Sequence, residues 1–385
     1  MRTPEEFDEI RPYDKKELPA IFEELIADEE FRAVVEQVMP DTPFDAACAL
    51  LRNCTDNLDV QKKLFYPLIT DLRNKICDGF VLDSDRISNK LQPHTFITNH
   101  RDIVLDSAFL SIALLDNGFE NTVEIAIGDN LLIRPWIRKL VRINKSFIVQ
   151  RAVSLRQMLA SSARMSRYMH YAITKKHENI WIAQREGRAK DSDDRTQDAI
   201  LKMMAMGGEG NVIERLKELH LVPTALSYEY DPCDYLKAKE FQQKRDIEDF
   251  KKSPADDLTN MQTGIFGYKG KVCFRMAECI DNWLDTLPVD MPKTDLFTVI
   301  ARHIDREIHR NYELYPGNYV AADLLRGTNV YAAFYTPEEK TRFEAYLQSR
   351  IRLVDLPNPD VAFLNERLLT MYANPVFNHI AAKHE

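Results

Sequence analysis

The chain has 385 residues, of which 45% are apolar, and its formal net charge is −9. This length is enough for one large domain or two smaller ones, and the acidic balance does not indicate a nucleic-acid-binding protein. The six cysteines form no Cys-x-x-Cys pair and no zinc-type spacing, so we expect a reducing compartment, no metal and no cofactor.

The N-terminal residues 1–6 lack the apolar core of a signal peptide, and no window approaches the roughly 20 apolar residues of a membrane-spanning helix. Residues 1 to about 80 are predicted to be helical. Apolar positions between 18 and 38 recur with a period near 3.6, and further helical runs cover 44–53 and 60–76. We therefore predict an N-terminal helical region, 1–80, that packs on the main domain or covers a substrate entrance.

From residue 79 onward, short β-branched or aromatic segments alternate with helical ones. We predict strands at 80–82, 96–98, 123–127, 147–149, 180–183 and 222–228, with helices at 103–115, 130–143 and 155–177. Strands that alternate with helices predict an α/β domain over 81–330, with a mostly parallel sheet flanked by helices.

The chain is less regular beyond residue 231. A charged segment at 237–252 predicts a helix that is solvated on most of its surface, and glycines between 264 and 273 predict a hairpin. Helices are predicted at 293–313, 337–349 and 358–372. We assign 331–385 to a C-terminal helical extension.

The segment 130–177 has an unusual charge, with eleven lysines and arginines and no Asp or Glu. Such a stretch in an acidic chain indicates a surface for anions, such as phosphate or an acidic carrier protein. Apolar and basic residues alternate around Trp136 between 131 and 143. This pattern fits either a helix lying at an anionic lipid interface or one whose apolar face packs on the sheet.

The most distinctive polar cluster separates the strand near 95–98 from the helix that follows it. It consists of Asn99, His100, Arg101 and Asp102. Open α/β sheets place reactive groups at the carboxyl ends of their strands. We interpret His100 as a general base oriented by Asp102 or Asp106. The alternative is a helix N-cap formed by Asn99 beside a surface histidine.

Three later stretches also end predicted strands with polar residues. Residues 145–151 end in Arg151, residues 181–190 contain Glu186, Gly187, Arg188 and Lys190, and residues 222–229 end in Tyr228 and Glu229. In a parallel sheet all these ends lie along the edge that carries His100, which predicts one convergent polar site.

The order of these four blocks resembles the glycerol-3-phosphate and lysophosphatidic acid acyltransferase family. Asn99-His100 precedes Asp106 by five intervening residues, where the family has four, and 147–151 matches its Phe-Ile-x-Arg block with one extra residue. Residues 184–190 are similar to its Glu-Gly-Thr-Arg-Ser block, and 222–229 keep its Val-Pro and Tyr-Glu. The resemblance covers about 93–230, and the tail at 193–197 is similar to a divergent bacterial branch.

This resemblance implies an acyltransferase of phospholipid biosynthesis. His100, oriented by Asp106 in preference to Asp102, would take the proton of a hydroxyl as that hydroxyl attacks an acyl thioester. The acceptor would be glycerol-3-phosphate or lysophosphatidic acid, and the donor acyl carrier protein or a CoA thioester. Alternatives are a non-glycerol acceptor such as an aminolipid, or a noncatalytic lipid or acyl-carrier binding protein.

The resemblance also implies roles for the remaining block residues. Arg151, Arg188 and Lys190 would bind the anionic head group of the acceptor, and Gly187 would allow close backbone approach. Glu186 would bind an acceptor hydroxyl or order the arginines, unless it forms a salt bridge with Arg185 or Arg188. We expect a cytoplasmic protein that is peripheral on the inner face of the cell membrane.

Overall fold

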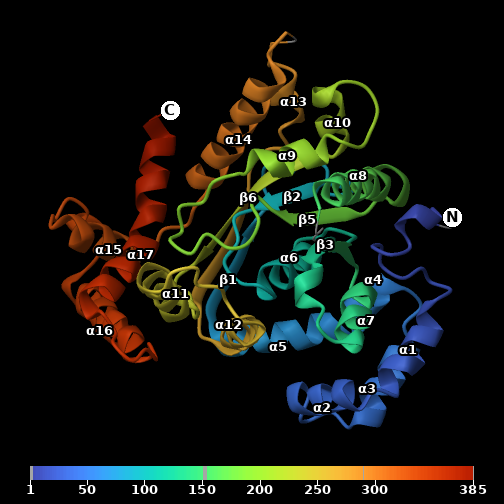
Figure 1. The fold of residues 1–385 in the computed structure, drawn as a ribbon, viewed down its shortest axis with the longest axis horizontal. Helices are drawn as coiled ribbons and strands as arrows, with labels where there is room; N and C mark the ends of the chain where they lie inside the picture. The colour runs from blue at the N-terminus through green and yellow to red at the C-terminus, as the bar shows by residue number, and fades with distance from the viewer. Residues whose placement is uncertain (1–2, 151–153, 289, 385) are drawn as a thin grey trace.

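The computed structural model describes residues 3–150, 154–288 and 290–384 (Figure 1). These residues form a seven-stranded sheet in the order β1-β7-β6-β2-β5-β3-β4. The strands are β1 (Cys77–Asp83), β2 (Thr95–Thr98), β3 (Val123–Gly128), β4 (Ser146–Val149), β5 (Asn179–Ala183), β6 (Leu221–Tyr228) and β7 (Gly270–Met276). Every neighbouring pair is parallel except β6 and β7. The predicted mostly parallel α/β fold is confirmed.

The helices surround this sheet and extend beyond it on two sides. Their bounds are α1 (Leu18–Ile26), α2 (Glu29–Val38), α3 (Phe44–Arg52), α4 (Asn57–Val60), α5 (Tyr66–Ile76), α6 (Leu105–Asp116), α7 (Pro135–Ile143), α8 (Leu155–Tyr171), α9 (Asp198–Met204), α10 (Val212–Glu218), α11 (Asp234–Asp246), α12 (Pro254–Phe266), α13 (Asp281–Leu284), α14 (Lys293–Arg310), α15 (Pro316–Arg326), α16 (Pro337–Arg352) and α17 (Val361–His384).

The central strands are buried on both faces. All residues of β2 and β6 are buried, as expected for strands covered by helices on each side. Ile97 of β2 faces a core shared with α8, α9 and α14, whereas Phe96 faces a second core shared with α5 and α6. Figure 1 shows these two helical layers on opposite sides of the sheet.

Helices α1, α2 and α3 pack with α7 rather than on the sheet, whereas α5 packs on the sheet. Trp136, Leu140 and Ile143 of α7 lie in one apolar cluster with Leu18 and Phe22 of α1. The apolar side of α7 is therefore covered by protein. No helix within the described ranges is long and apolar enough to cross a bilayer.

Much of the basic charge between 130 and 177 is paired within the chain. The partners are glutamates of the N-terminal region, of β3 and of the position before β5, in the pairs Arg134–Glu30, Lys139–Glu24, Lys145–Glu178, Arg164–Glu9, Arg167–Glu6 and Lys176–Glu124. The local surplus of positive charge therefore does not by itself mark a surface for an anionic partner.

Three local predictions were wrong. The periodic run 18–38 is two helices, because the side chain of Asp28 caps α2 through the Phe31 N–H. The predicted hairpin is instead the end of α12 followed by β7, which inserts between β1 and β6. The charged helix α11 is not mainly solvated, because Lys237 and Glu240 are buried in ion pairs with Asp231 and Lys190.

The C-terminal helices form a separate cluster beside the sheet. α17 packs on α15, α14 and α11, and its apolar residues share a core with α15 and α16. The helical extension expected at 331–385 is thus helical, but it shares its core with α15 and α11, which precede that boundary. The division at residue 330 stays a prediction.

Candidate active site

Asn99 joins the end of β2 to β6. Its side-chain amide donates to the Leu226 carbonyl and accepts from the Leu226 N–H, both at 2.8 Å. The residue is fully buried. Asn99 therefore continues the pairing of the two strands through its side chain and fixes the turn that carries His100, instead of capping a helix.

Asp102 is the residue that caps α6. Its Oδ1 accepts hydrogen bonds from the N–H groups of Val104 and Leu105, each at 2.9 Å. An acidic side chain in this position satisfies N–H groups that the first turn of a helix leaves unpaired. Its other oxygen, Oδ2, lies 3.7 Å from Lys269 Nζ. Asp102 is thus directed away from the histidine.

Asp106, on the first turn of α6, is the carboxylate beside His100. Its Oδ2 lies 2.7 Å from His100 Nδ1 and accepts the backbone N–H of Arg101 at 2.6 Å. The Asp102 N–H lies 3.0 Å from both of its oxygens, and the Tyr228 hydroxyl donates to Oδ1 at 2.8 Å. Three donors other than the imidazole therefore hold this buried carboxylate in place.

Tyr228 remains protonated in this arrangement. Burial first, and then the Asp106 carboxylate, raise the pKa of the Tyr228 hydroxyl well above its usual value. The hydroxyl therefore acts only as a donor to Asp106. Tyr228 belongs to the fourth sequence block, but nothing in the sequence indicated this contact across 122 residues.

The His100 imidazole lies at the edge of the sheet with one nitrogen engaged. Its ring packs edge-to-face on Trp181 of β5, with centroids 5.5 Å apart, and 12% of its side chain is exposed. Among the described residues, none forms a hydrogen bond with Nε2. With Nδ1 held by Asp106, Nε2 is the atom that a substrate hydroxyl would meet.

The loop after β5 starts beside His100. β2 and β5 are parallel neighbours, and the Gln184 N–H donates to the Thr98 carbonyl at 2.8 Å, which extends their pairing. Glu186 is exposed, and its N–H donates to Gln197 Oε1. Gly187 has φ +68° with open space where a Cβ would lie, so its backbone conformation, rather than a close approach, accounts for glycine.

Arg188 and Lys190 extend from this loop toward α12 and α11. Arg188 Nη2 donates to Asn260 Oδ1 at 3.0 Å. Its Nη1 is buried and has no partner within the described chain, and the same holds for Arg185 Nε and both amide atoms of Gln184. Lys190 pairs with Glu240, and burial lowers the pKa of its ammonium to about 8. The loop thus contains unsatisfied buried donors.

Arg151 lies outside the described residues. The strand that precedes it, β4, is three positions from β2 in the sheet order, which corresponds to roughly 14 Å at the usual spacing between strands. The structure thus brings together the first, third and fourth sequence blocks on the adjacent strands β2, β5 and β6.

A buried ion pair that sequence reasoning missed holds the β5 loop to the His100 turn. The Arg101 guanidinium forms two hydrogen bonds to Asp194, at 2.9 and 2.6 Å, and the Tyr312 hydroxyl donates to the same carboxylate. Burial alone would lower the pKa of Arg101, but Asp194 raises it above its usual value. No local pattern marks a pair 93 residues apart.

A small cavity adjoins this pair. It has a volume of about 30 Å³, and its lining includes Arg101, Tyr228, Asp231 and Tyr312. This volume is suited to water and is too small for an acyl chain.

Comparisons with known proteins find likeness to solved structures alone. No family model matches the chain, and no curated protein matches it. The crystal structure of the 1-acyl-sn-glycerophosphate (LPA) acyltransferase PlsC from Thermotoga maritima is similar with a TM-score of 0.36 and 11% identity, over 78% of this chain and 100% of that one. Because this TM-score is low, we derive function from the residues of the site.

The hydrogen bonds to Asp106 give a first testable prediction. Asp106→Ala leaves two backbone N–H groups and the Tyr228 hydroxyl without their acceptor, at about 1–3 kcal/mol each, so we expect the free energy of unfolding to fall by about 3 kcal/mol or more. Tyr228→Phe removes one bond and should cost about 1 kcal/mol. Urea unfolding followed by circular dichroism measures both.

Asp116→Ala, at the other end of the same helix, is the control. Asp116 pairs with Arg73 and accepts the Tyr66 hydroxyl, both at exposed positions, and its loss should cost about 1 kcal/mol. Equal losses for Asp106→Ala and Asp116→Ala would show that the Asp106 carboxylate is not a principal anchor of this turn.

Proposed function

We propose that this protein transfers a fatty acyl group from an acyl thioester to a hydroxyl of a glycerol-phosphate-type lipid precursor. The observation that carries the proposal is the His100–Asp106 pair, with Nδ1 at 2.7 Å from a carboxylate held by Tyr228 and two backbone N–H groups. This pair lies at the carboxyl edge of β2, where open α/β sheets bind their ligands. The four-block sequence resemblance supports the same class of reaction.

The proposed chemistry needs a base but no protein nucleophile. The acceptor hydroxyl attacks the thioester carbonyl while its proton passes to His100 Nε2. Asp106 fixes the tautomer that leaves Nε2 free to accept and stabilises the imidazolium that forms. The tetrahedral intermediate then expels the thiolate, which recovers the proton from Nε2, so the ester forms, the C–S bond breaks and no acyl-enzyme is required.

The anionic head group of the acceptor is assigned to the loop after β5. Arg188 Nη1 and Arg185 Nε are buried donors with no partner in the described part of the chain, and unmet buried donors favour an anionic ligand. We keep Glu186 as a contact for an acceptor hydroxyl and Arg151 as a further cation. Lys190 would have to exchange Glu240 for the ligand.

The proposal includes an acyl carrier protein or CoA thioester as donor and a membrane surface as the source of lipid. The first turns of α8 expose Met158 and Leu159 by 49% and 54%, close in sequence to the exposed Arg156. Apolar side chains next to a cation suit the interface of an anionic bilayer.

The role of His100 is tested by acyl transfer in purified variants. Asparagine cannot act as a general base, so His100→Asn should reduce kcat by at least about 100-fold. His177→Asn is the matched control, because His177 is exposed with φ +56°, a conformation that asparagine tolerates, and it should keep full activity. A labelled acyl thioester is offered with glycerol-3-phosphate, lysophosphatidic acid or an aminolipid alcohol.

The outcomes of this assay separate the alternatives. Activity of His100→Asn close to that of the unmodified chain would remove the histidine from the mechanism. An unmodified chain that binds acyl carrier protein but transfers no label to any acceptor would favour a noncatalytic binding protein. Circular dichroism of each variant ensures that a loss of activity does not come from unfolding.

Head-group binding is tested with Arg188→Ala. Loss of its unpaired guanidinium N–H should raise the apparent KM for the acceptor about tenfold or more and leave the KM for the acyl donor nearly unchanged. Arg245→Ala, which removes an exposed ion pair with Asp360 at the end of α11, should change neither constant. Equal changes in both constants for Arg188→Ala would contradict a role in acceptor binding.

Membrane association is tested by flotation with vesicles. The unmodified chain should float with anionic vesicles, and Met158→Glu combined with Leu159→Glu should abolish flotation, because the acidic side chains face the anionic surface. Leu258→Glu, at an exposed position on α12, should float normally. Flotation that is unchanged in the double variant would exclude the start of α8 as the contact.

A further inference from the structure

A second polar cluster lies at the opposite end of the strands from His100, beside the start of β6. β7 runs antiparallel to β6, so the end of β7 meets the start of β6. The Ile280 N–H donates to the Leu221 carbonyl at 3.0 Å, and the Ala277 N–H to the Pro223 carbonyl at 2.8 Å. These bonds bring His220, just before β6, next to the segment that follows β7.

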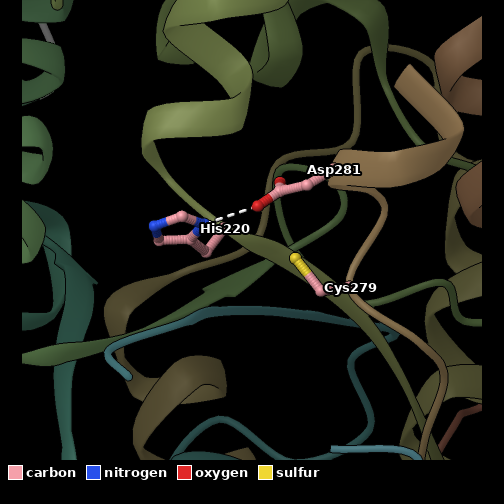
Figure 2. Close-up of side chains that lie close together, drawn as sticks. All are labelled: His220, Cys279 and Asp281. Carbon is pink, nitrogen blue, oxygen red and sulfur yellow. Dashed lines mark hydrogen bonds and ion pairs between the residues drawn. The ribbon is translucent and has the colours of Figure 1, made fainter. Parts of the chain in front are cut away.

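Three metal-binding side chains converge there. One ligand atom from each of His220, Cys279 and Asp281 lies within 4.8 Å of the other two (Figure 2). His220 Nδ1 is 2.5 Å from Asp281 Oδ2. Asp281 Oδ1 is buried and has no hydrogen-bond partner among the residues described. The carboxylate therefore has an unused oxygen inside the cluster.

The cluster does not have the arrangement of a nucleophile and its base. Figure 2 shows the sulfur of Cys279 directed toward Asp281, while the second nitrogen of the His220 ring points away from the sulfur. A catalytic thiol needs a base within hydrogen-bond reach. Here Nδ1 is engaged by Asp281, so the geometry favours a shared ligand over covalent catalysis.

The donor set is one that zinc prefers. Imidazole nitrogen, thiolate sulfur and carboxylate oxygen bind Zn²⁺ at about 2.0–2.3 Å in tetrahedral sites. Such bond lengths place neighbouring ligand atoms roughly 3.5 Å apart. To reach that spacing, His220 Nδ1 and Asp281 Oδ2, now 2.5 Å apart, would separate by about 1 Å, and Cys279 Sγ, within 4.8 Å of the other ligand atoms, would take its place by side-chain rotation. The carboxylate would then contact the ion in place of the imidazole N–H.

We propose that His220, Cys279 and Asp281 bind one Zn²⁺ ion, with water in the fourth position. The side chains of His220 and Asp281 are 28% and 21% exposed, so an ion can reach the site from solvent. A second imidazole adjoins it: the His94 ring lies 6.3 Å from that of His220, and its buried Nδ1 has no partner in the described ranges.

The ion would tie the start of β6 to the segment after β7. The two segments are already joined by the two backbone hydrogen bonds, by the His220–Asp281 pair, by the Lys217–Asp285 ion pair and by packing of α10 on α13. Metal binding to the folded chain alone stabilises it. Zinc should therefore act on the fold at this edge and not on the chemistry at His100.

The test uses the full chain, freed of metal with a chelator and titrated with Zn²⁺ alone. We expect one equivalent to bind by calorimetry and Tm to rise with zinc. Co²⁺ as a spectroscopic probe should give a thiolate charge-transfer band. Cys279→Ser should abolish that band, and Cys279→Ser, Asp281→Asn and His220→Asn should each weaken zinc binding by at least about tenfold.

Two controls come from the same protein. Cys48→Ser changes a buried cysteine of α3, and Asp285→Asn a carboxylate next to α13 that pairs with Lys217; both should bind zinc normally. His220 has φ +47°, a backbone conformation that asparagine tolerates. His220→Asn therefore provides a folded variant if Cys279→Ser does not fold.

Absence of zinc-dependent change in the unmodified chain, or equal zinc affinity in the folded cluster variants, would overturn the proposal. The measurement needs no acyl transfer. Its result is therefore independent of the function proposed for the His100 edge.

Discussion

The arrangement of the candidate site depends on one buried carboxylate. Besides its contact with His100, Asp106 accepts hydrogen bonds from the Tyr228 hydroxyl and from the N–H groups of Arg101 and Asp102. A buried carboxylate without such donors would be costly. Here the same donors that satisfy it also define its direction, so the turn, the helix start and β6 together determine where the imidazole lies.

The extra residue between His100 and Asp106, relative to the acyltransferase pattern, is accommodated in this turn. The added length lets Asp102 cap α6 through the N–H groups of Val104 and Leu105, while Asp106 stays on the first turn of the helix. Asp102 thus caps the helix, and Asp106 orients the histidine. The longer spacing therefore does not count against a working histidine–aspartate pair.

The general form of the fold could be predicted because its signals are local. Buried strands such as Thr95–Thr98 and long apolar helices such as Leu105–Asp116 follow from periodicity and composition. Parallel order then placed three of the four blocks at one edge. The resemblance preferred Asp106 to Asp102, but residues 95–107 alone left both aspartates open, because the choice depends on which carboxylate accepts the Tyr228 hydroxyl of β6.

Contacts between distant charged residues were not predictable in this way. The helix expected to be solvated near 237–252 has a partly buried first half, because Lys237 pairs with Asp231 and Glu240 with Lys190. Composition alone cannot show that such charges are paired. The Arg101–Asp194 pair was missed for the same reason. The direction of β7 was the most consequential feature that the sequence did not predict. β7 runs antiparallel to β6, so the end of β7 lies beside the start of β6. Its insertion between β1 and β6 brings Cys279 and Asp281 to His220, so one strand of reversed direction accounts for a second candidate site far from the first.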